Sequence, residues 1–212
     1  MNWNSDRSHE MRFYDYLDQV ETDRPGISLI RKRLGSFEIQ GPHGKHTCLV
    51  LGPLGITLDE VLDYFPQRKI SLGILKPSLR HILIQWTFSI PWALRILLSN
   101  FLLGVDDPAL FFSFEDAEHT QPAPRKILED RTIYVSRRMY ATDGLPFLCD
   151  LGQARFPEEI GNRGAYIMPD VYRAPEITMH MKWDCSVDVW NIAMVVCVNA
   201  SRDGFLFLTM SI

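Results

Sequence analysis

A short apolar run at residues 146–149 predicts a strand that leads into Asp-Leu-Gly at residues 150–152. A carboxylate at such a strand end is a group that can hold a hard cation, and a glycine lets the backbone turn sharply beside it. Asp-X-Gly is also common in ordinary turns, so this motif alone fits a purely structural turn. Two further motifs follow it along the chain: Ala-Pro-Glu at residues 174–176 and Asp-Val-Trp at residues 188–190. Three such motifs in this order and at this spacing are much less likely to occur by chance than one of them alone. The series of three motifs, rather than any one of them, indicates a functional site.

The elements that position these motifs can be predicted from the hydrophobic pattern. Apolar residues three to four apart predict a helix over residues 10–20, and two strand-like runs at 27–39 and 47–51 predict a hairpin. Residues 106–144 form a polar excursion whose centre we expect to be mobile. Further helical patterns and one strand-like run follow these ranges: helices at 57–65, 71–85 and 187–198, and a strand at 131–136. The fold class we expect is α+β.

The composition suits a globular protein of about one domain. Of the 212 residues, 46% are hydrophobic and 11% are aromatic, which is enough to bury a core. The net charge of -4 gives no basic surface of the kind that a nucleic-acid backbone requires, so we expect no direct nucleic-acid partner. The four cysteines lack Cys-X-X-Cys spacing and predict buried, reduced thiols, which favours the cytoplasm or nucleus.

We expect neither a secretory leader nor a membrane span. Residues 1–10 are polar and contain no apolar segment of the kind that a signal peptide needs. Residues 82–105 are apolar enough for a span to be considered, but four residues interrupt them: Gln85, Pro91, Arg95 and Asn100. A small membrane protein built around this segment is kept as an alternative.

The three motifs together resemble the C-lobe of a eukaryotic-type protein kinase. The resemblance implies that Asp150 binds Mg²⁺ on the ATP phosphates, with Gly152 providing the turn beside it. It also implies that Glu176 closes the activation segment and that Asp188 supports the catalytic loop through its backbone. The fold that it implies is a protein-kinase-like α+β fold of two lobes, with ATP and Mg²⁺ as cofactors.

A finer resemblance is to the SR-protein-specific, or SRPK-like, branch. Residues 36–50 are similar to the central hairpin of these kinases, and residues 169–176 are similar to the fungal members. The resemblance implies that the substrates are serines of Arg-Ser-rich proteins. It divides the chain as follows: an incomplete N-lobe of helix C and antiparallel strands at 1–51, a hinge at 52–55, an incomplete and mainly helical C-lobe at 56–198 that includes the excursion at 106–144, and an unassigned tail at 199–212.

The resemblance also gives roles to individual residues. Glu10 corresponds to the glutamate of helix C that pairs with a lysine of strand 3. Leu51 corresponds to the gatekeeper residue. Gly52 and Leu54 then offer hinge backbone groups to adenine. Asn100, which precedes an apolar strand, becomes the second Mg²⁺ ligand. On the residues alone, Glu10 fits a solvated acid in a first helical turn, and Gly52 fits a simple strand-exit turn.

Several parts of a kinase are missing from the pattern. No aspartate lies between Asp63 and Asp106, although the family places its catalytic aspartate shortly before the position of Asn100. Lys-Pro-Ser at residues 76–78 superficially matches the catalytic loop but lies too early in the chain. Because only nine residues precede Glu10, we expect the Gly-rich loop and the strand-3 lysine to be absent as well. No catalytic residue is identified, and we expect no phosphoryl transfer by the chain.

The alternative function is a non-catalytic, pseudokinase-like binding scaffold. Acids such as Glu158, Glu159 and Asp170 would then attract Arg-rich segments, although they fit a solvated face equally well. Residues 86–96 and 199–212 look like foreign sequence inserted into an otherwise coherent kinase, which is a hypothesis about splicing. Missing strands and helices would also leave apolar surface uncovered, so we expect poor solubility.

Overall fold

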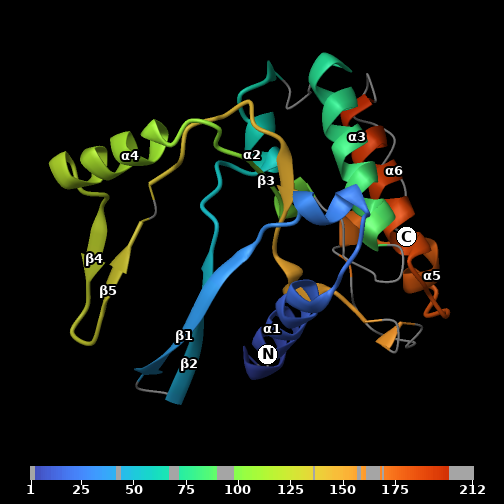
Figure 1. The fold of residues 1–212 in the computed structure, drawn as a ribbon. Coiled ribbons are helices and arrows are strands. Elements are labelled where there is room, and N and C mark those ends of the chain that lie inside the picture. Colours follow the sequence, from blue (N-terminus) through green and yellow to red (C-terminus); the bar gives the residue numbers. More distant parts are fainter. Residues whose placement is uncertain are drawn as a thin grey trace.

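The computed structural model describes residues 3–41, 44–66, 72–89, 98–135, 137–156, 159–160, 168 and 170–200. The fold is α+β, built from helices and antiparallel strand pairs (Figure 1). The helices are α1 (Trp3–Gln19), α2 (Leu58–Leu62), α3 (Leu72–Ser89), α4 (Ala109–Thr120), α5 (Pro175–Thr178) and α6 (Ser186–Ala200). The strands are β1 (Arg33–Gly41), β2 (Gly44–Leu51), β3 (Phe101–Leu103), β4 (Arg125–Ile127), β5 (Thr132–Tyr134) and β6 (Pro146–Leu148). Short 3-10 helices are η1 (Pro25–Leu29), η3 (Leu98–Asn100), η4 (Leu151–Gln153) and η6 (Asp170–Tyr172).

The predicted N-terminal helix is confirmed, although α1 begins earlier, at Trp3. The predicted strand at 27–39 is wrong over its first residues, which form η1. Pro25 is tolerated at the start of η1 because its fixed φ suits a helical turn and its missing N–H would have no partner there. The N–H of Ile30 then donates to the carbonyl of Ile27 at 3.2 Å and closes the turn.

The predicted hairpin is confirmed as the antiparallel pair β1–β2. Phe37 pairs with Cys48 and Ile39 with His46, and a bulge interrupts the register between Arg33 and Gly35. Because successive side chains alternate between faces, Phe37 and Ile39 share one face, and it is open to solvent: they are 54% and 47% exposed. This agrees with the expectation of uncovered apolar surface.

Two helices follow the hairpin, as predicted. Thr57 and Glu60 form a capping box at the start of α2, in which the Thr57 hydroxyl accepts from the N–H of Glu60 and the Glu60 carboxylate accepts from the N–H of Thr57. The helix predicted at 71–85 is confirmed as α3, which continues to Ser89; residues 90–96 lie outside the described residues. Lys-Pro-Ser at 76–78 lies within α3, where Pro77 is a helix residue, and not in a catalytic loop. In the described ranges, no helix is long and apolar enough to cross a bilayer.

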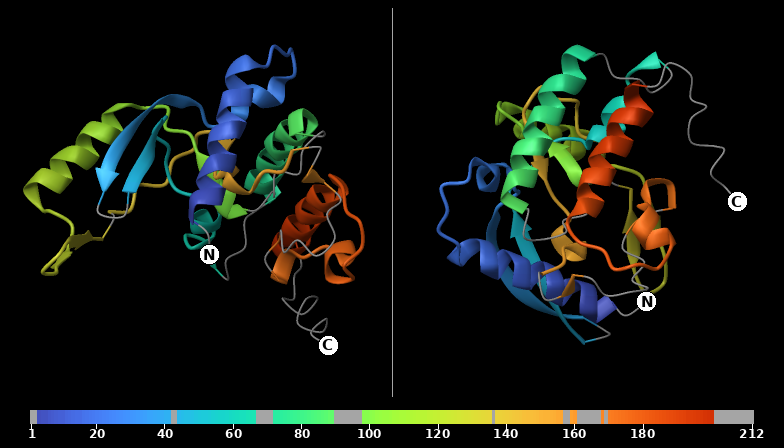
Figure 2. Two further views of the ribbon diagram at one scale, coloured as in Figure 1. Left: turned by 90° about the horizontal axis from the view of Figure 1, so that it is seen from below. Right: turned by 90° about the vertical axis from the view of Figure 1, so that its right-hand side faces the viewer.

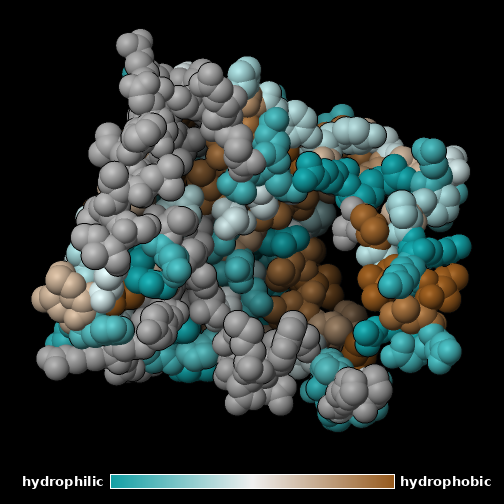
Figure 3. All heavy atoms as spheres, turned by 180° about the vertical axis from the view of Figure 1, so that it is seen from behind, coloured by the Kyte–Doolittle hydropathy of each residue, from teal (hydrophilic) through white to brown (hydrophobic). Residues whose placement is uncertain are grey.

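The excursion at 106–144 is more regular than predicted. It contains α4 and the hairpin β4–β5, and this module stands out from one side of the molecule (Figures 1 and 2). No residue of α4 is buried. A helix that packs no side against a core does not need apolar residues at regular three-to-four spacing, so the sequence of α4 gave little sign of a helix. The Arg137 side chain holds the module together by donating to the Glu118 carboxylate at 2.9 Å and to the carbonyl of Ala117 at 3.1 Å. Apolar side chains of the β1–β2 and β4–β5 regions border a hollow on the back of the molecule (Figure 3).

One main core connects the N-terminal and C-terminal parts. Its buried side chains include Phe13 of α1, Ile82 of α3, Phe101 of β3, Leu148 of β6 and Ile192 of α6. Helices α3 and α6 lie side by side over one end of this core (Figure 2). The elements α1, β3, β6 and α6 thereby share one core.

The prediction of buried thiols is correct for only one of the four cysteines. All four are free, and Cys149 at the end of β6 is buried. Burial raises the pKa of the Cys149 thiol to about 11. Cys48 of β2 and Cys185, which directly precedes α6, are half-buried, and Cys197 of α6 is exposed.

Candidate functional site

The strand pair β3–β6 brings the two predicted metal ligands to one end of a small sheet. Phe101 pairs with Leu148, and the N–H of Cys149 donates to the carbonyl of Asn100 at 2.7 Å. Asn100 and Asp150 therefore flank the same end of the pair. Asn100 is buried, at 6% exposure, whereas Asp150 is exposed.

Asp150 has an unusual backbone conformation. Its φ of 54° and ψ of 62° lie in the left-handed region, which residues other than glycine rarely adopt. The neighbours Cys149 and Leu151 are 4% and 0% exposed, so packing fixes the chain on both sides of the turn. Backbone outliers of this kind cluster at functional sites, where the surrounding structure holds them.

Glu10 of α1 lies next to this turn. Its carboxylate accepts a hydrogen bond from the N–H of Leu151, and the carboxylate of Asp150 is near enough to act on it electrostatically. Burial, followed by the negative charge of Asp150, raises the pKa of Glu10 above its ordinary value, while Arg31 and the Leu151 N–H act in the opposite direction. The ionised form of Glu10 is therefore disfavoured in the folded protein.

Aromatic packing seats α1 against the segment that follows Asp150. The ring of Phe156 lies 5.9 Å from that of Phe13 and 6.5 Å from that of Tyr16, centroid to centroid. Phe13 is fully buried and Phe156 is 9% exposed. This cluster fixes the position of α1, and with it the position of Glu10 relative to Asp150.

Glu159 reinforces the same contact. Its carboxylate lies 3.4 Å from Nη1 of Arg12 and 3.6 Å from Nε2 of His9, and it accepts from the N–H of Phe156 at 3.0 Å. The Arg12 guanidinium also lies over the Phe156 ring, 4.6 Å from its centroid. The interpretation of Glu159 as a substrate-facing or solvated acid is wrong, because its side chain is only 24% exposed and is paired with Arg12 of α1. Glu158 lies outside the described residues.

The predicted hinge lies at the end of β2, where Leu51 is half-buried. The N–H of Gly52 donates to the carbonyl of Lys32 at 3.2 Å, and the carbonyl of Gly52 accepts from Nε of Arg31 at 2.7 Å. Both backbone groups of Gly52 thus have partners within the chain. The half-buried Leu54 lies between Gly52 and the point where the N–H of Gly55 donates to Leu103 of β3 at 2.7 Å.

The remaining motif residues gather in two places. Gly152 is buried in η4, directly after Asp150. Glu176 and Asp188 lie in α5 and α6, beside a second buried cluster formed by Met168, Ala174, Ile177, Trp183 and Val187. Asp188 is completely buried, at 0% exposure, whereas Glu176 is half-buried. The structure therefore brings Glu10, Asn100, Asp150 and Gly152 to one region and Glu176 and Asp188 to another.

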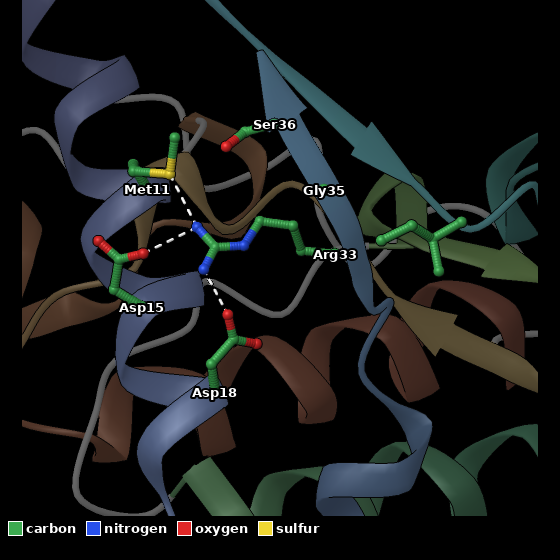
Figure 4. Close-up of a pocket in the computed structure, with 7 residues that line it drawn as sticks. Met11, Asp15, Asp18, Arg33, Gly35 and Ser36 are labelled. Atoms are coloured by element: carbon green, nitrogen blue, oxygen red, sulfur yellow. Dashed lines mark hydrogen bonds and ion pairs between the residues drawn. The ribbon is translucent and has the colours of Figure 1, made fainter.

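A separate hollow of about 520 Å³ lies between α1 and β1, and sequence reasoning did not predict it. Arg33 at its centre donates to Asp15 at 2.8 Å, to the sulfur of Met11 at 2.9 Å and to Asp18 (Figure 4). These carboxylates raise the pKa of Arg33, so the guanidinium stays charged. The hollow contains two carboxylates and one guanidinium, and the guanidinium is paired with both carboxylates.

The donors at the end of β6 suit one kind of ion. Across the described part of the chain, no group of three or more His, Cys, Asp or Glu side chains is arranged to hold a metal. Asp150 and Asn100 offer one carboxylate and one amide oxygen. This set fits Mg²⁺, which usually takes one or two carboxylate ligands and completes its shell with water and phosphate oxygens. Asp150 and Asn100 are the oxygen donors at this end of the strand pair whose chemistry suits such an ion.

Known proteins that are similar to the chain are protein kinases. No protein-family model matches it. A serine/threonine protein kinase of Aspergillus fumigatus is 32% identical over 197 residues, which make up 91% of this chain and 47% of the relative, with the same values in two strains. The serine/threonine-protein kinase SRPK of Physarum polycephalum is 28% identical over 211 residues, which make up 86% of this chain and 48% of that protein. The chain is related to the SRPK-like serine/threonine protein kinases.

The resemblance predicted from the sequence motifs is thereby confirmed. A third relative of this SRPK-like chain, the serine/threonine-protein kinase Doa of Drosophila melanogaster, is 29% identical over 154 residues, or 73% of this chain and 16% of Doa. The SRPK-like chain spans about half the length of its Aspergillus and Physarum relatives.

Replacing Glu10 by glutamine is expected to stabilise this SRPK-like chain near neutral pH. A carboxyl group whose pKa is raised on folding contributes stability below its unfolded pKa, and this contribution is lost as the pH rises through the folded pKa. Glutamine stays neutral, so the melting temperature of Glu10→Gln should exceed that of the wild type at about pH 7 and approach it at about pH 4. Thermal melts across this range measure the difference.

The matched control is Glu129→Gln, which removes an exposed carboxylate in the β4–β5 turn. Its melting temperature should follow that of the wild type at every pH. A Glu10→Gln variant that is less stable than the wild type at neutral pH would contradict the assigned environment of Glu10.

Proposed function

We propose that this chain binds Mg·ATP at the end of the β3–β6 pair and is part of a kinase that phosphorylates serine in Arg-Ser-rich proteins. The observation that carries the proposal is the hydrogen bond of 2.7 Å from Cys149 to Asn100, which sets Asn100 beside Asp150. In this proposal, Asp150 and Asn100 hold the metal. When bound, Mg²⁺ neutralises charge on the phosphate oxygens.

Adenine would be received by the backbone between Leu51 and Gly55. The carbonyl of Gly52 already accepts from Arg31, but a carbonyl oxygen has a second lone pair. The backbone groups of Leu54 would provide the other contacts. The two-lobed division into residues 1–51, 52–55 and 56–198 is part of the proposal, as is a location in the cytoplasm or nucleus.

The name of the Physarum relative supports substrates rich in Arg-Ser sequences. Asp170, whose side chain is 86% exposed, is the described acid that we propose meets such a substrate. Its carboxylate is paired with Arg173 of the same segment, so a substrate arginine would have to share or displace that partner.

A pseudokinase-like scaffold is the second candidate function, and a feature within the chain favours it. No aspartate lies between Asp63 and Asp106, so no carboxylate precedes Asn100 in the position of the family's catalytic residue. A missing general base removes about 10²- to 10⁴-fold of catalysis. We therefore propose that the 212 residues bind nucleotide but transfer phosphate slowly, if at all.

Mg·ATP is expected to raise the melting temperature of the wild-type chain and to leave Asp150→Asn almost unaffected. A ligand at a concentration about 100 times its dissociation constant stabilises the native state by roughly 2.7 kcal/mol. The neutral amide in Asp150→Asn is a weaker metal ligand than the carboxylate, so the variant should bind Mg·ATP less well. Thermal-shift titrations with and without Mg²⁺ provide the measurement.

Asp130→Asn is the matched control, since Asp130 is 72% exposed in the β4–β5 turn and lies in a different part of the molecule. It should respond to Mg·ATP as the wild type does. Equal shifts in the Asp150 variant and the wild type would disprove the metal assignment. Phosphate incorporation into an Arg-Ser peptide that depends on Asp150 would favour the kinase over the scaffold.

A further inference from the structure

Arg31 connects the two halves of the candidate nucleotide site. Its N–H donates to the carbonyl of Leu148, the last residue of β6, at 2.9 Å. Its side-chain Nε donates to the carbonyl of Gly52 in the hinge at 2.7 Å, in a partly buried position. One residue thus spans from the strand that delivers Asp150 to the backbone proposed to receive adenine.

The guanidinium is also the cation that acts on the groups in this region. Those groups are Glu10 and Tyr14 of α1 and Cys149 at the end of β6; Arg33 of β1 acts on Tyr14 as well. Arg31 lowers the pKa of Glu10, Tyr14 and Cys149, against the upward effect of burial.

We propose that Arg31 is a positioning residue of the nucleotide site, which fixes the Gly52 carbonyl relative to the Asp150 turn. The proposal rests on the proposed nucleotide binding. A planar guanidinium suits this role because its donors have fixed directions, whereas an ammonium group supplies the charge without that geometry. Nothing in the pattern of the sequence distinguishes Arg31 from its neighbours Lys32 and Arg33.

The test compares Arg31→Met and Arg31→Lys with the wild type. Calorimetric titration with Mg·ADP is expected to show about tenfold weaker binding for Arg31→Met, the effect of losing one charge-assisted hydrogen bond, and an intermediate loss for Arg31→Lys. Hydrogen exchange at residues 51–55 and 148–152 should become faster in both variants. Lys32→Met is the matched control, because it removes an adjacent exposed cation and keeps the Lys32 carbonyl that receives Gly52; it should behave as the wild type.

The conservative variant separates this role from a purely structural one. Arg31→Lys keeps the charge but not the fixed donor directions of the guanidinium, so its melting temperature should stay close to that of the wild type while exchange at 51–55 becomes faster and Mg·ADP binds more weakly. If Arg31→Met does not fold, Arg31→Lys decides by the same two readouts. Unchanged exchange at 51–55, or equal effects from Lys32→Met, would overturn the proposal.

These readouts distinguish the two proposals. A wild-type chain that does not bind Mg·ADP refutes the proposed nucleotide site. In that case the exchange results still show whether Arg31 joins the hinge to the Asp150 turn. Binding by the wild type that Arg31→Met leaves unchanged refutes the role of Arg31 alone.

Discussion

Phe13→Ala is expected to lower the free energy of unfolding by about 3–5 kcal/mol, the usual result of removing a fully buried phenylalanine from a core. Phe13 is 0% exposed, and its ring lies 6.3 Å from that of Tyr16 and 5.9 Å from that of Phe156. Domains are commonly stable by only about 5–15 kcal/mol, so this loss is a large share of the total. Because these rings seat α1, the exchange protection of the segment after Asp150 should fall too.

The control for Phe13→Ala is Phe112→Ala in α4, the same substitution at a side chain that is 67% exposed. It should change stability by no more than about 0.5 kcal/mol. Denaturant unfolding of both variants and of the wild type measures the two effects. Equal losses at Phe13 and Phe112 would contradict the assignment of Phe13 to the main core.

Gly144→Ala is expected to destabilise the chain by about 3 kcal/mol, at the upper end of the usual range for overpacking. A Cβ atom at Gly144 would lie 2.2 Å from the carbonyl oxygen and 2.6 Å from the carbonyl carbon of Gly104. Backbone atoms cannot rotate away as a flexible side chain can. The two segments would therefore have to separate where the N–H of Gly104 donates to the carbonyl of Leu145 at 2.8 Å.

Gly35→Ala provides the matched control, since a Cβ atom there would meet nothing within 4 Å. This bulge position in β1 should accept alanine with little change in the denaturation midpoint. Gly144 directly precedes the chain's return into β6, so its substitution should also loosen the strand that carries Asp150. A Gly144→Ala variant as stable as Gly35→Ala would show that Gly104 and Gly144 do not approach closely.

The local elements of the fold could be predicted where a sequence pattern is sufficient to specify structure. The β1–β2 hairpin has a turn between two strand-like runs, and α2 has a capping residue, Thr57, three residues before Glu60. Prediction failed for the excursion, because α4 buries no residue and so shows little hydrophobic periodicity. It also failed at η1, where apolar residues that suit a strand follow Pro25 and adopt a helical turn.

The sequence by itself determined that Asp150, Gly152, Glu176 and Asp188 form an ordered series, and it indicated the kinase relationship, since both depend on residue types and spacing along one chain. Only the tertiary structure decided that Arg31 connects Gly52 to Leu148 and that Glu159 faces Arg12. Those partners are far apart in sequence. Their contacts arise from the packing of α1, β1 and β6 around a shared core, which no local spacing rule can specify.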